Sequence, residues 1–180
     1  MPIRKFISKQ NCIVLLFSLS FCFSCSLEKS EEILAAEKLL PDIIDYNFHV
    51  KPILSDKCFA CHGPDAKNQK ANLRLDQKEH AYATLSSGNG RAVVPNSASK
   101  SLIINRILSS EKDIVMPPPE TNLFLNSKEK AILIKWIEQG AEYKSHWAFI
   151  KPKTRKIPVN GEDWAKNEID HFILDKLKMN

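Results

Sequence analysis

The feature that most constrains this chain is a pair of cysteines followed at once by a histidine, in the order Cys58-Phe59-Ala60-Cys61-His62. This is the C-x-x-C-H pattern by which c-type haem is attached. Two thiols at this spacing, at the end of a helix, can bond one edge of a haem, and the next residue then places an imidazole beneath the iron. We therefore predict one covalently bound haem c, held by Cys58 and Cys61, with His62 as the proximal iron ligand.

Other uses of a C-x-x-C pair are zinc binding and dithiol redox chemistry. The remaining cysteines, Cys12, Cys22 and Cys25, all lie near the N-terminus. A structural zinc site needs about four protein ligands, and a thioredoxin-like site needs a βαβ context. This region instead indicates a helix followed by a long polar loop. Haem is therefore favoured over both, and a plain disulfide in an oxidising compartment is the alternative left open.

The distal iron ligand can be sought by elimination. Met116 is the only methionine in the central part of the chain, because Met1 opens the sequence and Met179 is the penultimate residue. The three prolines at 117–119 stiffen the backbone and reduce the entropy lost in holding the thioether at the iron. We predict that Met116 is the distal ligand. Filling a gap in the core is the alternative role, and His80 is the first replacement ligand to consider.

The first 25 residues are predicted to be an export signal, because three basic residues precede an apolar run over residues 12–23 that is too short to span a bilayer. Residues 22–26 resemble the end of a bacterial lipoprotein signal, in which a cysteine becomes the lipid-bearing N-terminus. Cys25 fits best, because the small Ser24 precedes it. We expect export to the periplasmic side of the cell envelope with a lipid anchor at Cys25. A simple cleaved secretory signal is the first alternative. A transmembrane anchor is the least favoured, because Ser18, Ser20 and Ser24 dilute an already short apolar run.

The net charge of the chain argues only against a strongly basic binding surface. The net charge of +5 includes three basic residues in the predicted signal, so the mature part carries 23 basic against 21 acidic residues. Nothing in this balance requires a nucleic-acid partner. We expect a redox partner protein in the cell envelope, and contact with the membrane only through the lipid anchor.

The rest of the chain is predicted to be mainly α-helical, with long loops. Residues 26–44 are interpreted as a tether that includes some helical spacing, residues 45–143 as the haem domain, and residues 144–180 as a linker and the start of a second domain. Within the haem domain we predict three helices, over residues 47–57, over residues 101–108, and from an N-cap at Asn126 to a stop at Gly140. The first and third are expected to cross beside the haem. A further amphipathic helix is predicted over residues 167–177.

Several stretches together resemble the planctomycete-type cytochrome c domain. They are FHVKPILSDKCFACHGPD at 48–65, LRLD at 73–76, VVPNSASKSLIINRI at 93–107, MPPP at 116–119 and KEKAILIKWIEQGA at 128–141. The resemblance implies an all-α, cytochrome c-like fold around a covalent haem. It also implies attachment at Cys58 and Cys61, ligation by His62, and Met116 in the distal position. Arg74 and Arg91 are candidates for contacts with the haem propionates, with a solvated surface role as the alternative.

The end of the chain carries a second resemblance. HWAF at 146–149 and WAKNEIDHFILDKL at 164–177 resemble the start of the domain of unknown function that follows this cytochrome in large multidomain members. We therefore expect a truncated version or a fragment of such a protein. The predicted function is electron transfer without substrate chemistry of its own. The alternatives are an electron-transfer segment of a larger multidomain enzyme, and a haem-based sensor or gas-binding module.

The lipoprotein interpretation predicts that Cys25→Ser releases the protein from membranes or changes its location, because serine cannot carry the thioether-linked lipid. Cys22→Ser is the matched control and should leave the protein with the membrane. Fractionation and mass spectrometry of the mature N-terminus check this. An unmodified N-terminus produced by cleavage elsewhere would contradict it.

Overall fold

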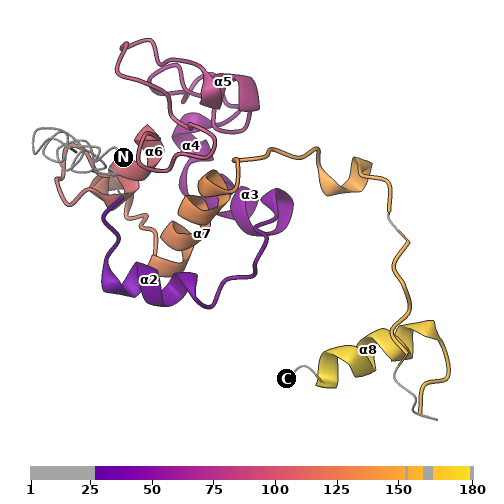
Figure 1. The fold of residues 1–180 in the computed structure, drawn as a ribbon. Helices are drawn as coiled ribbons and strands as arrows, with labels where there is room; N and C mark the ends of the chain where they lie inside the picture. Colours follow the sequence, from indigo (N-terminus) through magenta and orange to yellow (C-terminus); the bar gives the residue numbers. More distant parts are fainter. Residues whose placement is uncertain (1–26, 153, 160–163, 179–180) are drawn as a thin grey trace, which may run out of the picture. The chain divides into compact units, whose positions relative to one another are not determined.

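The computed structural model describes residues 27–152, 154–159 and 164–178 (Figure 1). The chain divides into two compact units, Met1–Lys144 and Ser145–Asn180. The described residues form seven α-helices and no strand, with one isolated β-bridge between Thr84 and Arg91. The prediction of an all-α fold is confirmed. The predicted export signal and Cys25 lie outside the described residues.

Helix α7 (Ser127–Glu138) begins and ends where the sequence indicates. The side chain of Asn126 accepts a hydrogen bond from the Glu129 N–H at 2.9 Å, and the Glu129 carboxylate accepts one from the Asn126 N–H at 2.8 Å. This capping box satisfies backbone donors that the first turn leaves unpaired. Gly140 follows the helix with a φ of +103°, a left-handed conformation that glycine adopts without steric cost and that lets the chain turn away.

The first unit is built around α7. Three elements contact it: α2 (Glu31–Glu37), the π-helical turn η2 (Tyr46–Val50) and α6 (Leu102–Leu108). Because neighbours cover more than one face, its buried side chains form a nearly continuous run: Ala131, Ile132, Leu133, Ile134, Trp136 and Ile137. Each large apolar side chain that is fully buried contributes about 1.5–3 kcal/mol. The packing of α7 therefore determines where the other elements of the unit lie.

Residues 27–44, which the sequence suggested were a tether, are packed into the first unit. Ile33, Leu40 and Ile44 are buried, and α2 packs on α7. The Lys29 ammonium lies 3.2 Å from the carboxylate of Glu138. Spacing alone could not show this packing, because the partner surface lies about 100 residues further along the chain.

The first predicted helix forms as two consecutive elements, η2 and α3 (Lys51–Lys57). Asp45 caps η2 by accepting hydrogen bonds from the N–H groups of Asn47 and Phe48 at 2.8 and 3.2 Å. Pro52 stands in the first turn of α3, where its fixed φ suits a helix. The second predicted helix is observed as α6.

Two short helices, α4 (Phe59–His62) and α5 (Lys78–Tyr82), were not predicted. They are too short to show a periodic apolar pattern, and isolated helices of this length are unstable in water. Tertiary contacts hold them. The Val93 N–H donates to the Ala81 carbonyl at 2.9 Å and so joins α5 to the segment that precedes α6.

The second unit contains the 3₁₀ turn η4 (Trp147–Phe149) and α8 (Glu168–Lys178), so the predicted C-terminal helix is present. Trp147, Phe149 and Trp164 are exposed, and Leu174 is the only buried residue of α8 among those described. A membrane-crossing helix is absent from the described ranges, since none of their helices combines the necessary length and apolar character.

Ser101 offers a test of how the segment before α6 is held. Its buried hydroxyl accepts from the Val94 N–H at 2.8 Å and donates to the Ser97 carbonyl at 2.8 Å. Ser101→Ala should lower the free energy of unfolding by about 1–3 kcal/mol, because it leaves the Val94 N–H and the Ser97 carbonyl without this partner. Denaturant titration measures the loss. Ser110→Ala, at an exposed position, is the control, and equal stability of the two variants would contradict this role.

Candidate haem site

The two cysteines and the histidine lie together at the junction of α3 and α4. Cys58 ends α3 and caps α4, while Cys61 and His62 are on α4 itself. The Cys58 N–H donates to the Leu54 carbonyl at 2.9 Å, and the His62 N–H donates to the Cys58 carbonyl at 2.8 Å. The backbone thus runs almost without interruption from one helix into the next. One turn of helix presents two sulfurs and an imidazole.

Neither thiol forms a disulfide with any cysteine that the structure describes, and both are partly buried. Burial raises the pKa of Cys58 to about 12, with smaller contributions from the charges of Cys61 and Glu129, so the thiol is protonated at neutral pH in this folded state. Cys58 also packs against the edge of the hydrophobic core. The disulfide that the sequence left open is not formed here.

The imidazole of His62 has a ring nitrogen that lacks a partner. Nδ1 is buried and makes no hydrogen bond to any described part of the chain. Burial lowers the pKa of His62, against a smaller opposing effect of the Lys70 and Leu73 backbone. A neutral imidazole is the form that ligates iron. A buried nitrogen without a partner is the kind of unsatisfied group that a missing ligand would account for.

The loop after α4 returns to hold the motif by its backbone. The Lys70 N–H donates to the Cys61 carbonyl and the Leu75 N–H donates to the His62 carbonyl, each at 2.8 Å. Without these bonds, carbonyl groups at the end of α4 would lack partners. The LRLD stretch, which the sequence flagged only by resemblance, therefore braces the segment that carries His62.

Gly63 makes this return possible, and sequence reasoning gave it no role. A Cβ at this position would overlap the Phe59 carbonyl oxygen and lie 2.6 Å from the Phe59 Cβ. The φ of Gly63 is −119°, so close packing rather than a left-handed backbone requires glycine here. Its place directly after His62 is the one signal in the sequence that could have drawn attention to it.

Met116 lies in the loop between α6 and α7 and is partly buried. Arg106, in the last turn of α6, braces this loop in two ways. Its carbonyl accepts from the Met116 N–H at 3.1 Å, and its guanidinium donates to the Ile114 carbonyl at 3.2 Å. Beyond the prolines, the 3₁₀ turn η3 (Pro119–Thr121) closes with a hydrogen bond from the Thr121 hydroxyl to the Pro118 carbonyl at 2.7 Å. Sequence spacing gave no sign that Arg106 has this role.

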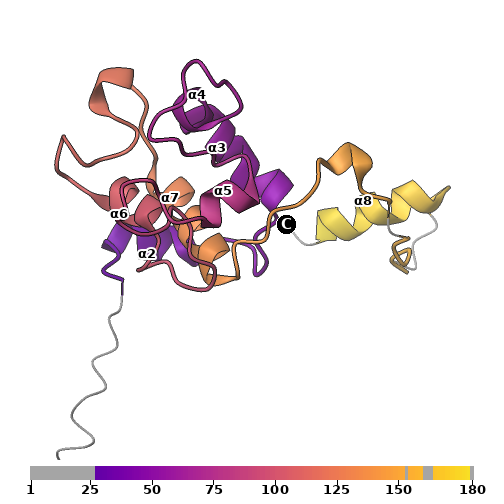
Figure 2. The ribbon, with the colours of Figure 1, turned by 90° about the horizontal axis from the view of Figure 1, so that it is seen from above.

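Figure 2 shows α4 and the loop that carries Met116 rising on the same side of α6 and α7. The donor set therefore suits a haem. Two free thiols and an imidazole nitrogen without a partner are on one segment, and a thioether is on a second, braced segment. The described residues contain no cluster of three or more His, Cys, Asp or Glu side chains that could hold a separate metal ion.

The other residues considered from the sequence lie as follows. The Arg74 guanidinium forms a two-pronged ion pair with Asp76, with Nε 3.0 Å from the carboxylate. Arg91 and His80 are exposed, the latter on α5. His49, a further histidine of the first unit, has its Nδ1 already engaged, since it accepts from the Asp45 N–H at 2.8 Å.

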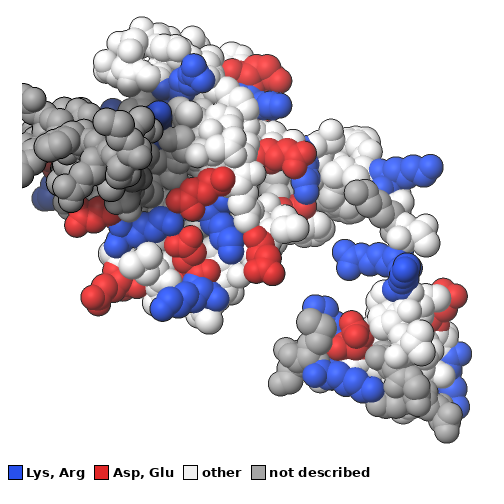
Figure 3. All heavy atoms as spheres, in the orientation of Figure 1, with Lys and Arg blue, Asp and Glu red and all other residues white. Residues whose placement is uncertain are grey.

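Charges of both signs are interspersed over the face of the first unit that Figure 3 shows. Within the first unit, Lys29 forms an ion pair with Glu37, and the Lys144 ammonium lies 2.7 Å from the Asp45 carboxylate. This face offers a mixed surface rather than a field of one sign.

Two cysteines, a histidine and a methionine are the donors that a c-type cytochrome segment uses. Residues 58–120 match the family model described as Planctomycete cytochrome C, which confirms the resemblance seen in the sequence over this range. The matched range includes all four predicted haem-binding residues. A cytochrome c family match over this segment suggests haem-binding electron transfer, with haem c as the group bound. Searches of curated proteins and of solved structures gave no match.

Gly63 yields a prediction about the motif. Gly63→Ala should lower the free energy of unfolding by about 3 kcal/mol, because the backbone of α4 must shift to admit the methyl group. It should also reduce the haem content of the purified protein. Gly88→Ala is the control. Its added Cβ meets nothing within 4 Å, although a φ of +73° disfavours alanine, so it should cost about 1 kcal/mol. A Gly63→Ala variant with native stability and haem content would contradict this prediction, because it would show that the backbone of α4 can shift at little cost in free energy.

Proposed function

We propose that this chain holds one haem covalently and transfers single electrons in the cell envelope. The observation that carries the proposal is the short α4 segment with its cap Cys58, in which two thiols accompany a buried imidazole nitrogen that has no hydrogen-bond partner among the described residues. Cys58 and Cys61 form the thioether attachments, His62 is the proximal ligand, and Met116 is the distal ligand. The family match supports the haem assignment.

The bound haem supplies an iron that gains and loses one electron. The residues of the chain control that change. His62 is held on a backbone braced by Leu75, and Met116 on one braced by Arg106. A soft thioether favours the ferrous state relative to a second imidazole. Apolar packing around Cys58 disfavours the extra positive charge of the ferric state, and so acts in the same direction.

The place of action and the partner form the second part of the proposal. The predicted signal supports export, and Cys25 supports a lipid anchor. A redox protein of the same compartment is the expected partner. Its docking is expected to use the mixed charges of the surface, which steer encounter more than they add affinity.

Covalent attachment is tested by haem staining after denaturing electrophoresis and by a pyridine haemochrome spectrum. Protein matured in an export-competent host should retain its haem, because thioether bonds survive denaturation. Cys58→Ala and Cys61→Ala should each leave at most one thioether and little stable holoprotein. Ser55→Ala, on an exposed position of α3, is the control and should retain haem. Complete loss of haem from the denatured wild-type protein contradicts the proposal.

Met116→Ala tests the distal ligand. It should remove the weak charge-transfer band of thioether-bound ferric haem near the red limit of the visible spectrum. It should also lower the reduction potential and open the sixth position to carbon monoxide, because the thioether is gone while the haem stays attached. Val115→Ala, at the partly buried neighbouring position, is the control.

Two results would change this assignment. An unchanged band and potential in Met116→Ala would mean that Met116 only packs. Ready binding of carbon monoxide by the reduced wild-type protein would favour a gas sensor over an electron carrier.

A further inference from the structure

Tyr143 lies beyond the segment matched by the family model, yet its hydroxyl reaches the backbone that braces the haem motif. The hydroxyl donates to the Leu75 carbonyl at 3.0 Å. The N–H of the same residue, Leu75, donates to the His62 carbonyl at 2.8 Å. Two consecutive hydrogen bonds thus link the chain after α7 to the predicted proximal ligand.

The phenol ring of Tyr143 is fixed by an aromatic cluster. Its centroid lies 4.8 Å from that of Tyr46, 5.2 Å from Trp136 and 5.9 Å from Tyr82. Edge-to-face and tilted contacts of this kind are favourable and restrict ring motion. Burial raises the pKa of Tyr143 above its usual range, with further contributions led by Tyr46. The hydroxyl therefore stays protonated and remains a donor.

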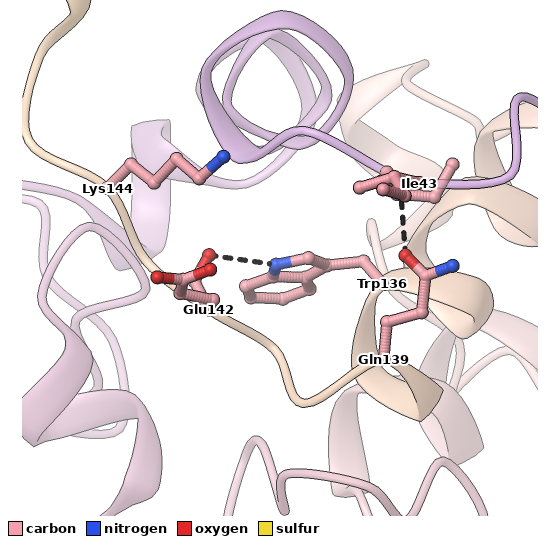
Figure 4. A pocket seen from close by; sticks show the side chains of 6 residues that line it. Ile43, Trp136, Gln139, Glu142 and Lys144 are labelled. Carbon is pink, nitrogen blue, oxygen red and sulfur yellow. Dashed lines mark hydrogen bonds between the residues drawn. The ribbon is translucent and has the colours of Figure 1, made fainter.

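The backbone that carries Tyr143 is also fixed (Figure 4). The indole N–H of Trp136 donates to the Glu142 carbonyl at 3.2 Å, and the Ala141 N–H donates to the Trp136 carbonyl at 2.9 Å. Figure 4 looks into the hollow beside this turn, where the Gln139 side chain also accepts from the Ile44 N–H at 2.9 Å. Tyr143 is thus a donor anchored to α7, the most buried helix of the unit.

We propose that Tyr143 is a positioning residue for the haem, acting on His62 through Leu75. Leu75 is only 3% exposed, so water cannot readily replace a lost partner at its carbonyl. Removal of the Tyr143 hydroxyl leaves the Leu75 carbonyl without its hydrogen-bond donor. The backbone at Leu75 is then held less firmly, and the hydrogen bond from the Leu75 N–H to the His62 carbonyl is weakened. The inference rests on the proposed function, because it takes His62 to be an iron ligand.

Tyr82 provides a matched control in the same cluster. Its hydroxyl also donates to a backbone carbonyl, that of Ala141, at 2.6 Å. That bond does not involve Leu75. Tyr143→Phe and Tyr82→Phe therefore remove the same chemical group from one aromatic cluster, and only the first interrupts the link to His62.

The experiment uses the full chain with its haem and has two readouts. In Tyr143→Phe, the Leu75 amide should exchange its hydrogen about tenfold faster than in Tyr82→Phe, as expected for the loss of one supporting hydrogen bond. The equilibrium constant for reduction should change by about threefold or more, within the range that mutations along such networks produce. Tyr82→Phe should leave it unchanged. Replacement of Tyr143 by 4-aminophenylalanine, whose amine can donate, should restore both values.

The possible outcomes are distinct. Equal changes in the two phenylalanine variants, or an unchanged reduction equilibrium in Tyr143→Phe, overturn the positioning role. If Tyr143→Phe does not fold, the aminophenylalanine variant decides, because a positioning role requires it to keep the wild-type amide exchange and reduction equilibrium. A wild-type protein without covalent haem would refute the proposed function. The hydrogen exchange of the Leu75 amide would then still show whether the Tyr143 hydroxyl stabilises the hydrogen bond between Leu75 and His62.

Discussion

The burial of α7 is the constraint on which the rest of the first unit depends. Trp136 is 2% exposed, and the apolar residues around it face neighbours on more than one side. Such a helix cannot lie at the surface without exposing a large apolar area to water. The apolar surface of α7 is covered by three elements: α2, η2 and α6. Each of them is connected to a loop of the haem site or to a terminal segment, which is positioned by this packing. The same helix anchors the turn that ends in Tyr143.

The haem motif itself is a weak element of structure. α4 comprises Phe59–His62, and a helix of this length does not persist alone. It is stable here because α3 leads directly into it and because Gly63 lets the chain after it pack close to Phe59. The N–H groups of Lys70 and Leu75 also donate hydrogen bonds to its last carbonyl groups. The reactive groups therefore stand on a segment whose position is determined by its surroundings.

Both predicted iron ligands are braced through the backbone by residues 13 and 10 positions away along the chain. His62 is held through Leu75, and Met116 through Arg106. In an electron carrier the two ligands must keep their positions in both oxidation states, and backbone hydrogen bonds within a packed unit provide that rigidity. A sensor would instead require the distal ligand to leave the iron easily. The double bracing of the Met116 loop by Arg106 is consistent with the electron-transfer proposal.

The sequence by itself indicated the haem chemistry and determined the long elements. C-x-x-C-H, the lone central methionine, the capping box of α7 and the glycine that ends it are local patterns, and each has a physical reason to be where it is. Tertiary structure decided the packing of residues 27–44 on α7, the short helices α4 and α5, and the contacts of Arg106 and Tyr143. These depend on pairs such as Tyr143 and Leu75, 68 residues apart, whose meeting leaves no periodic signal. Local spacing predicts which groups can react, whereas long-range packing determines how firmly they are held.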